Sequence, residues 1–148
     1  MKRSAIARLS ALVMTVAVAW LAAPAFAAAV ARVQLRHTSA GTILVNGKGF
    51  TLYSFTRDPR NRDRCASTSG CASIWQLLRT NGKPIAGKGV EHRLLGSIRV
   101  GHSRQVTYAG HPLYTYIADP GPGSTDYVGF EQFGGKWFAL NANGKVVR

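Results

Sequence analysis

Leu52-Tyr53-Ser54-Phe55-Thr56-Arg57-Asp58-Pro59 returns 61 residues later as Leu113-Tyr114-Thr115-Tyr116-Ile117-Ala118-Asp119-Pro120, and this duplication determines the architecture of the chain. The same offset aligns Val45 with Val106 and Gly49 with Gly110 without a gap. Self-similarity at a fixed spacing marks a duplicated structural unit. We therefore expect two pseudo-equivalent repeats, at about 40–80 and about 97–147, which share one core.

Both copies have the pattern of a β-hairpin. In the first, the β-branched run 42–45 leads into Asn46-Gly47-Lys48-Gly49, a strong turn signal, and then into a return strand at 50–55. Large apolar side chains fall on both faces of that return strand, which predicts a central position in its sheet. In the second copy, the strand, turn and return are expected at 104–108, 109–110 and 111–117.

The remaining segments complete an all-β fold of two meanders. A lead-in at 28–40 contains one short strand, and a short helical turn is expected near 71–78. Residues 136–147 have the pattern of a closing hairpin. Glycine and proline mark 81–88 and 119–126 as long connections.

The first 27 residues have the pattern of a secretory signal peptide. Lys2 and Arg3 precede an apolar run at 11–21, and Ala25-Phe26-Ala27 supplies a small-x-small cleavage site. The run is shorter than the ~20 residues that a membrane-spanning helix needs. We expect a single domain at 28–148 in a periplasmic or secreted protein, without a transmembrane segment.

The exported part is strongly basic. Three of the 19 Lys and Arg lie in the signal peptide, which leaves 16 against six acidic residues, a net charge of +10. Such a surface favours anionic partners. The densest stretch, 57–64, holds four arginines, but Asp58 and Asp63 lie among them and weaken it as a track for a polyanion.

Cys65 and Cys71 are the only cysteines of the chain. An even pair in an oxidising compartment predicts a disulfide, worth roughly 2 kcal/mol for so short a loop. A redox pair or a thiolate metal site is the alternative, but redox motifs normally have two intervening residues and this pair has five.

Aromatic and acidic residues recur in both copies. The pairs Tyr53 with Phe55 and Tyr114 with Tyr116 each share one strand face, where they can pack in the core or hold a flat ligand. Packing is the better explanation, with the tyrosine hydroxyls bound to polar partners. Asp58 and Asp119 each precede a proline, and turn capping explains them best.

Other side chains give weaker signals for binding. Trp75 and Trp137 follow the two repeated strands at a spacing of 62. Asp126 closes the second long loop and could offer a carboxylate to a hard cation. His102 and His111 lie on neighbouring expected strands, which allows a two-histidine site. Zinc-protease, covalent-haem, serine-hydrolase, Rossmann and P-loop motifs are absent from the sequence.

Tyr53-x-Phe55-x-x-Asp58 and Tyr114-x-Tyr116-x-x-Asp119 resemble the Y-x-[FWY]-x-x-D signature of the bacterial secreted-repeat lipoproteins of unknown function. The segments 110–114 and 134–137 are similar to the second repeat of that family, and the cysteine pair followed by Trp75 is similar to the first. The chain departs from the family in its wider cysteine spacing and in lacking a lipobox. The resemblance implies a duplicated envelope module with no established activity.

The sequence thus predicts an exported envelope module that is a non-catalytic binding or structural protein, with no cofactor. Two alternatives stay open. One is a metal or redox accessory protein that uses His111, His102 and the aspartate loops. The other is a binder of anionic envelope polymer through the basic surface, and an envelope protein is a further candidate partner.

Overall fold

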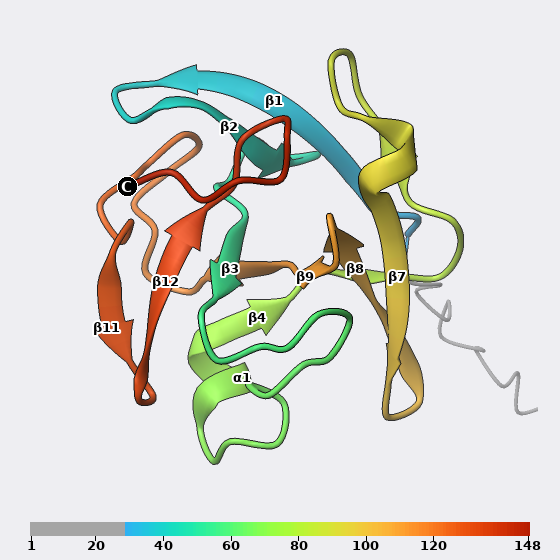
Figure 1. Ribbon diagram of the computed structural model, residues 1–148, viewed down its shortest axis with the longest axis vertical. Coiled ribbons are helices and arrows are strands. Elements are labelled where there is room, and N and C mark those ends of the chain that lie inside the picture. The colour runs from blue at the N-terminus through green and yellow to red at the C-terminus, as the bar shows by residue number, and fades with distance from the viewer. Residues whose placement is uncertain (1–28) are drawn as a thin grey trace, which may run out of the picture.

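A computed structural model describes residues 29–148, so the predicted signal peptide lies outside the described residues. Strands dominate it (Figure 1). In chain order the elements are β1 (Arg32–Thr38), β2 (Gly41–Asn46), β3 (Tyr53–Phe55), α1 (Cys71–Ile74), β4 (Trp75–Leu77), β5 (Arg79–Thr80), β6 (Ile85–Ala86), the 3-10 turn η1 (His92–Leu94), β7 (Leu95–Val100), β8 (Ser103–Tyr108), β9 (His111–Pro112), β10 (Tyr114–Tyr116), β11 (Phe130–Gln132) and β12 (Gly135–Ala139). The all-β prediction is confirmed, and α1 confirms the helical turn expected near 71–78. No helix within 29–148 is long and apolar enough to cross a membrane.

Each repeat begins with a long antiparallel hairpin. β1 pairs with β2 as far as Thr38–Gly41, and β7 pairs with β8 as far as Val100–Ser103. In Figure 1, β1 and β7 are the long curved strands at the periphery of the molecule. The sequence indicated only a short strand in the first lead-in and none before the second copy. Gly96 and the polar residues of β7 interrupt the alternating pattern of a strand. Pairing with β8 stabilises the extended conformation that the local strand propensity does not favour.

The two repeats exchange strands in the central sheet, whose order is β11-β12-β3-β10-β4. β3 of the first repeat pairs with β12 of the second, and β10 of the second pairs with β4 of the first. The two return strands meet at Tyr53 and Tyr114, which are directly opposite each other. The prediction that 50–55 supplies a central strand is confirmed, and the sheet has a pseudo-two-fold axis between β3 and β10.

Backbone hydrogen bonds correct the ungapped alignment of the copies. The Leu44 amide donates to the Leu140 carbonyl, and the Val106 amide donates in the same way to the Leu78 carbonyl. Leu44, not Val45, is therefore the counterpart of Val106. The offset is 62 in the hairpins and 61 in the return strands, because the first turn has one residue more than the Ala109–Gly110 turn.

Several expected boundaries were wrong. The return predicted at 111–117 is divided into β9 and β10 at Leu113, whose amide and carbonyl bond to Val106 and Leu78. The closing hairpin at 136–147, in contrast, is present: the Val147 amide donates to the Ala139 carbonyl and the Asn141 amide to the Lys145 carbonyl, on either side of the Leu140–Val146 bridge. Two connections contain short strands: β6 pairs in parallel with β1, and β11 pairs with β12. These strands of two or three residues have no periodicity that a sequence could display.

The core has two main clusters. An aliphatic cluster lies under the hairpins and contains Val33, Leu44, Leu52, Val90, Val106, Tyr108, Leu113 and Leu140. An aromatic cluster lies on one face of the central sheet and contains Tyr53, Phe55, Cys65, Cys71, Trp75, Tyr114 and Trp137. The motif residues of both repeats thus belong to the second cluster, with Tyr116 packed against it.

Candidate functional site

The motif tyrosines and aspartates form two hydrogen bonds that cross between the repeats. The Tyr114 hydroxyl donates to Oδ2 of Asp58 at 2.7 Å, and the Tyr53 hydroxyl donates to Oδ1 of Asp119 at 3.1 Å. Each tyrosine therefore binds the aspartate of the other copy. The expectation that the tyrosine hydroxyls bind polar partners is confirmed. The two copies are therefore joined by side-chain hydrogen bonds as well as by strand pairing.

Turn capping explains only one of the two aspartates. Oδ1 of Asp58 accepts the Arg64 amide at 2.8 Å and so closes its own loop. Oδ1 of Asp119 accepts the Tyr53 hydroxyl, and its Oδ2 is buried without a partner among the described residues. Within 29–148 no backbone amide of its own turn donates to the Asp119 carboxylate, so capping by backbone amides is seen for Asp58 alone, whereas Asp119 binds the opposite repeat.

Both carboxyls titrate far above their ordinary range. Burial, with a smaller contribution from the charge of Asp63, raises the pKa of Asp58 to about 6, against the hydrogen bonds that lower it. Burial and the charge of Asp126 raise the pKa of Asp119 to about 6. Burial, followed by the opposing carboxylate, raises the pKa values of Tyr53 and Tyr114, so these phenols remain donors. Such carboxyls can act as acids near neutral pH, but their partners here are structural phenols.

The aromatic rings form a column whose two ends differ in tilt, because Phe55 lies 9° from the plane of Trp137 and Tyr116 lies 41° from the plane of Trp75. Trp75 and Trp137 lie face to face at the centre, with centroids 3.9 Å apart and planes 1° apart. Phe55 stacks on the outer face of Trp137 at 4.2 Å, and Tyr116 lies on Trp75 at 4.3 Å. Repeat-equivalent residues therefore occupy equivalent places in the column, and the packing interpretation of the aromatic pairs is confirmed.

The column offers a ligand little surface. Both tryptophans are fully buried, and Gln132 satisfies both indoles: its side-chain oxygen accepts from Trp75 at 2.8 Å and its carbonyl from Trp137 at 3.3 Å. Tyr127 extends the column beyond Tyr116 at 4.1 Å. Neither Gln132 nor Tyr127 could be predicted from the sequence, because both lie in segments that the duplication does not repeat.

The predicted disulfide between Cys65 and Cys71 is present, and both half-cystines are fully buried in the aromatic cluster. Its loop follows the stretch 57–64, whose two acids are turned toward the protein. Asp58 accepts Tyr114 and the Arg64 amide, while Asp63 accepts the Ala66 amide at 2.7 Å and has its other oxygen buried. The arginines of this stretch are exposed.

We call Arg57, Arg60, Arg62 and Arg64 the arginine ridge. The Arg57 guanidinium donates to the Phe133 carbonyl at 2.7 Å, and that of Arg60 donates to the Ala109 carbonyl at 2.9 Å. Carbonyls fix the position of a guanidinium without cancelling its charge. Within 29–148 the one salt bridge joins Arg93 to Glu91, so no ridge arginine is ion-paired there.

The histidines do not form the paired site that their positions allowed. His102 precedes β8, whereas His111 is opposite Tyr108 at its other end, roughly 20 Å away along the strand. Burial and the charge of Arg60 lower the pKa of His111. Asp126 and His102 are exposed. In the described part of the chain, no three His, Cys, Asp or Glu side chains gather as metal ligands.

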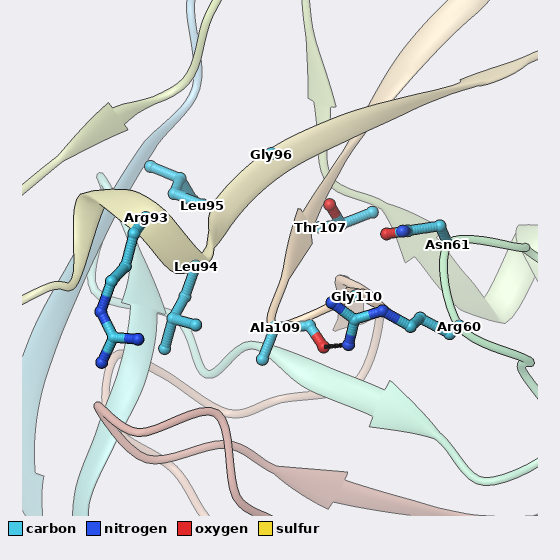
Figure 2. Close-up of a pocket in the computed structure, with 9 residues that line it drawn as sticks. All are labelled: Arg60, Asn61, Arg93, Leu94, Leu95, Gly96, Thr107, Ala109 and Gly110. Carbon is cyan, nitrogen blue, oxygen red and sulfur yellow. Dashed lines mark hydrogen bonds between the residues drawn. The ribbon is translucent and has the colours of Figure 1, made fainter.

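A small pocket lies beside the arginine ridge, with a volume of about 200 Å³. Figure 2 shows Arg60 and Asn61 on one side of it, Arg93, Leu94 and Leu95 on the other, and Thr107 between them. Sequence reasoning noted the arginine density but not this pocket, because its walls come from separate segments of the two repeats.

Comparison with protein families agrees with the duplicated architecture. The sequence model of a family described as a secreted repeat of unknown function matches residues 35–79 and again residues 101–141. These two matches include both return strands and both motif aspartates. No curated protein and no solved structure matches the chain.

Proposed function

This chain belongs to the family of secreted repeats of unknown function, and we propose that it is a non-catalytic binding module of the cell envelope that holds an anionic polymer on the arginine ridge. One observation carries the proposal: the two acids inside the ridge face the protein, while its four arginines face solvent. The carboxylates that weaken the ridge in the sequence therefore do not compete for it in the fold.

Charge balance supports the same function. The described residues include 16 Lys and Arg and six Asp and Glu, and two of those acids are the motif aspartates with pKa values of about 6. Unpaired arginines on a rigid frame attract a polyanion over a range of about 8–10 Å at physiological salt. Arginine also binds carboxylate and phosphate through two parallel N–H donors.

The exposed apolar residues favour a polymer over a membrane. Proteins that bind a bilayer surface combine basic residues with apolar side chains that enter the interface. The large hydrophobic residues exposed within 29–148 are Val30, Ile85, Ile117, Phe130 and Val146. None of these lies on the arginine ridge, which therefore suits a hydrated anionic chain.

Affinity for a carboxylate polymer tests the proposal, with polygalacturonate as the probe. Arg62→Gln/Arg64→Gln removes two charges from the ridge, and Lys83→Gln/Lys88→Gln removes two charges from the exposed 81–88 loop as a matched control. We expect the ridge variant to lose about tenfold in affinity and the control less than threefold, with affinity falling steeply as salt rises.

Equal losses of affinity in the two variants would show that binding is general charge attraction, and would contradict a specific role for the ridge. Absence of binding to the wild-type protein at 50 mM salt would contradict the function itself. Vesicles of anionic lipid and a duplex DNA of matched charge serve as competitors. If the protein binds either competitor more tightly than the polysaccharide, the polysaccharide is not its partner.

A further inference from the structure

We propose that the pocket beside the arginine ridge binds a single carboxylate or phosphate group, so that one charged unit of the polymer is held in a defined place. This inference rests on the proposed function, to which it adds a specific subsite. The pocket volume of about 200 Å³ fits one anionic group with part of the sugar or polyol that carries it, and it is too small for a larger ligand.

Arg60 is held ready for such a group. Its Nη1 donates to the Ala109 carbonyl, and its side chain crosses the face of Gly110, where an added Cβ would lie 2.7 Å from its Cγ. Only glycine permits this close approach, and Gly110 also has a φ of +83°. One donor of the guanidinium is used on the protein, so the others are free for an anion.

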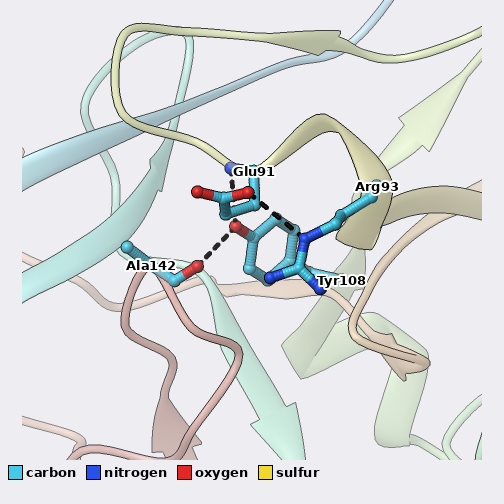
Figure 3. Close-up of polar contacts among 4 residues, drawn as sticks. All are labelled: Glu91, Arg93, Tyr108 and Ala142. Atoms are coloured by element: carbon cyan, nitrogen blue, oxygen red, sulfur yellow. Dashed lines mark hydrogen bonds and ion pairs between the residues drawn. The ribbon is translucent and has the colours of Figure 1, made fainter.

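The opposite wall supplies a second guanidinium, whose Nε is ion-paired with Glu91 and whose Nη donors make no hydrogen bond within 29–148. Arg93 leaves η1 on the far side of the pocket from Arg60, and its Nε contacts Glu91 at 3.4 Å (Figures 2 and 3). Figure 3 also shows why this wall is fixed: the Tyr108 hydroxyl accepts the Glu91 amide at 3.0 Å and donates to the Ala142 carbonyl at 2.7 Å. A buried tyrosine thus anchors the segment that presents Arg93.

Two strained residues line the same pocket. Asn61 has a φ of 56° and Ala109 a φ of 50°, and Phe133 is the one other non-glycine residue of 29–148 with a positive φ. The methyl group of alanine cannot form a local hydrogen bond that favours this conformation, so the two-residue turn between β8 and β9 holds the Ala109 backbone there. Strained backbone concentrates at binding sites, where it keeps groups in place. Here it places the Ala109 carbonyl under Arg60 and Asn61 at the rim.

The pseudo-two-fold axis shows that this pocket is particular to one half. The Asn61 amide donates to the Gly110 carbonyl, just as the Gly123 amide donates to that of Gly49. In the second place, however, Arg36 and Pro122 lie against the glycines and occupy the space. The hairpin offset of 62 puts Ile98 at the position of Arg36, so the arginine in the first place is Arg60 of the ridge and none comes from the hairpin.

A titration with inorganic phosphate and, separately, galacturonate tests the subsite by ¹H–¹⁵N NMR on the mature protein. We expect saturable shifts of the Asn61, Gly96 and Gly110 amides and of the Arg60 Nε–H. The pKa of His111, which the charge of Arg60 lowers, should rise when an anion neutralises that charge. Arg60→Gln and Arg93→Gln should each weaken binding by about tenfold, and Arg62→Gln by less than twofold.

Equal effects of Arg60→Gln and Arg62→Gln, or shifts spread over all the arginines, would overturn the subsite. Arg60→Lys keeps the charge and the fold, and should still bind several-fold more weakly because it lacks the paired donors. The two proposals fail differently. Polymer affinity that survives Arg60→Gln would contradict the subsite and still support polymer binding on the ridge. Saturable phosphate binding without polymer binding would contradict the polymer as partner and still support the subsite.

Discussion

Removing the hydroxyl of Tyr114 measures how firmly the two repeats are joined. In Tyr114→Phe the aromatic packing remains, but the 2.7 Å hydrogen bond to the largely buried Asp58 carboxylate is lost. A hydrogen bond to a charged group contributes about 1.5–3 kcal/mol, and we expect the free energy of unfolding at pH 7.5 to fall by that amount. The longer 3.1 Å bond of Tyr53 to Asp119 predicts about 1 kcal/mol for Tyr53→Phe.

The loss should depend on pH. Because the pKa of Asp58 is about 6, the carboxyl is protonated at pH 5 and the lost bond becomes a neutral one, worth about 1 kcal/mol. Urea unfolding followed by tryptophan fluorescence gives both values. In double-mutant cycles Tyr114→Phe should couple to Asp58→Ala by about 1 kcal/mol or more and be additive with Asp119→Ala. Coupling to Asp119 instead, or a loss below 0.5 kcal/mol, would refute the crossed pairing.

Three further predictions concern the same frame. Asp119→Asn should gain stability relative to the wild type as pH rises from about 4 to 7. The Asp119 carboxyl has a pKa of about 6 when folded against 3.8 when unfolded, so in this window the folded wild type binds more protons and loses stability as pH rises. Urea midpoints measure this, and a constant difference in midpoint between variant and wild type would contradict the prediction. Cys65→Ser/Cys71→Ser should lower the free energy of unfolding by about 2 kcal/mol while far-ultraviolet circular dichroism stays unchanged; a loss of strand signal would show that the disulfide is needed for the fold. Either Trp75→Phe or Trp137→Phe should abolish an exciton couplet near 230 nm in circular dichroism and cost about 2 kcal/mol, and a couplet that survives one substitution would disprove the face-to-face stack.

The features that could be predicted from the sequence are those that depend on a local pattern of residues. The repeat, the central strand around Tyr53, the disulfide and the packing of the aromatic pairs each follow from a short stretch and its chemistry. β7 was hidden because Gly96 and Arg99 break its apolar alternation, and only its partner strand makes it extended. The one-residue shift between hairpins and return strands was hidden for a different reason: matching Val45 with Val106 is chemically as good as matching Leu44 with it.

The crossed partners could not be predicted from the motif. Tyr53 and Asp58 are five residues apart, and a bond within one repeat satisfies the same sequence as a bond between repeats. The topology decides, because β3 and β10 meet side by side and carry each hydroxyl into the other copy. The two histidines illustrate the opposite error: His111 lies on a strand that pairs with β8, but His102 lies in the turn before β8, and the length of β8 separates the two residues.

The symmetry of the molecule separates its scaffold from its surface for binding. The Tyr–Asp bond occurs once for each repeat and the single ring column receives equivalent residues from both, so each of these contacts has an equivalent that stabilises the same sheet. A contact present in both halves is explained by the frame. The arginine ridge has no counterpart after β10, and its pocket, built from both repeats, lies on one side of the axis only, where Arg60 lies over Gly110 and the equivalent Gly49 meets Pro122 and Arg36. Since the frame does not require this difference, the asymmetric half is the place where substitutions should change binding and leave folding intact.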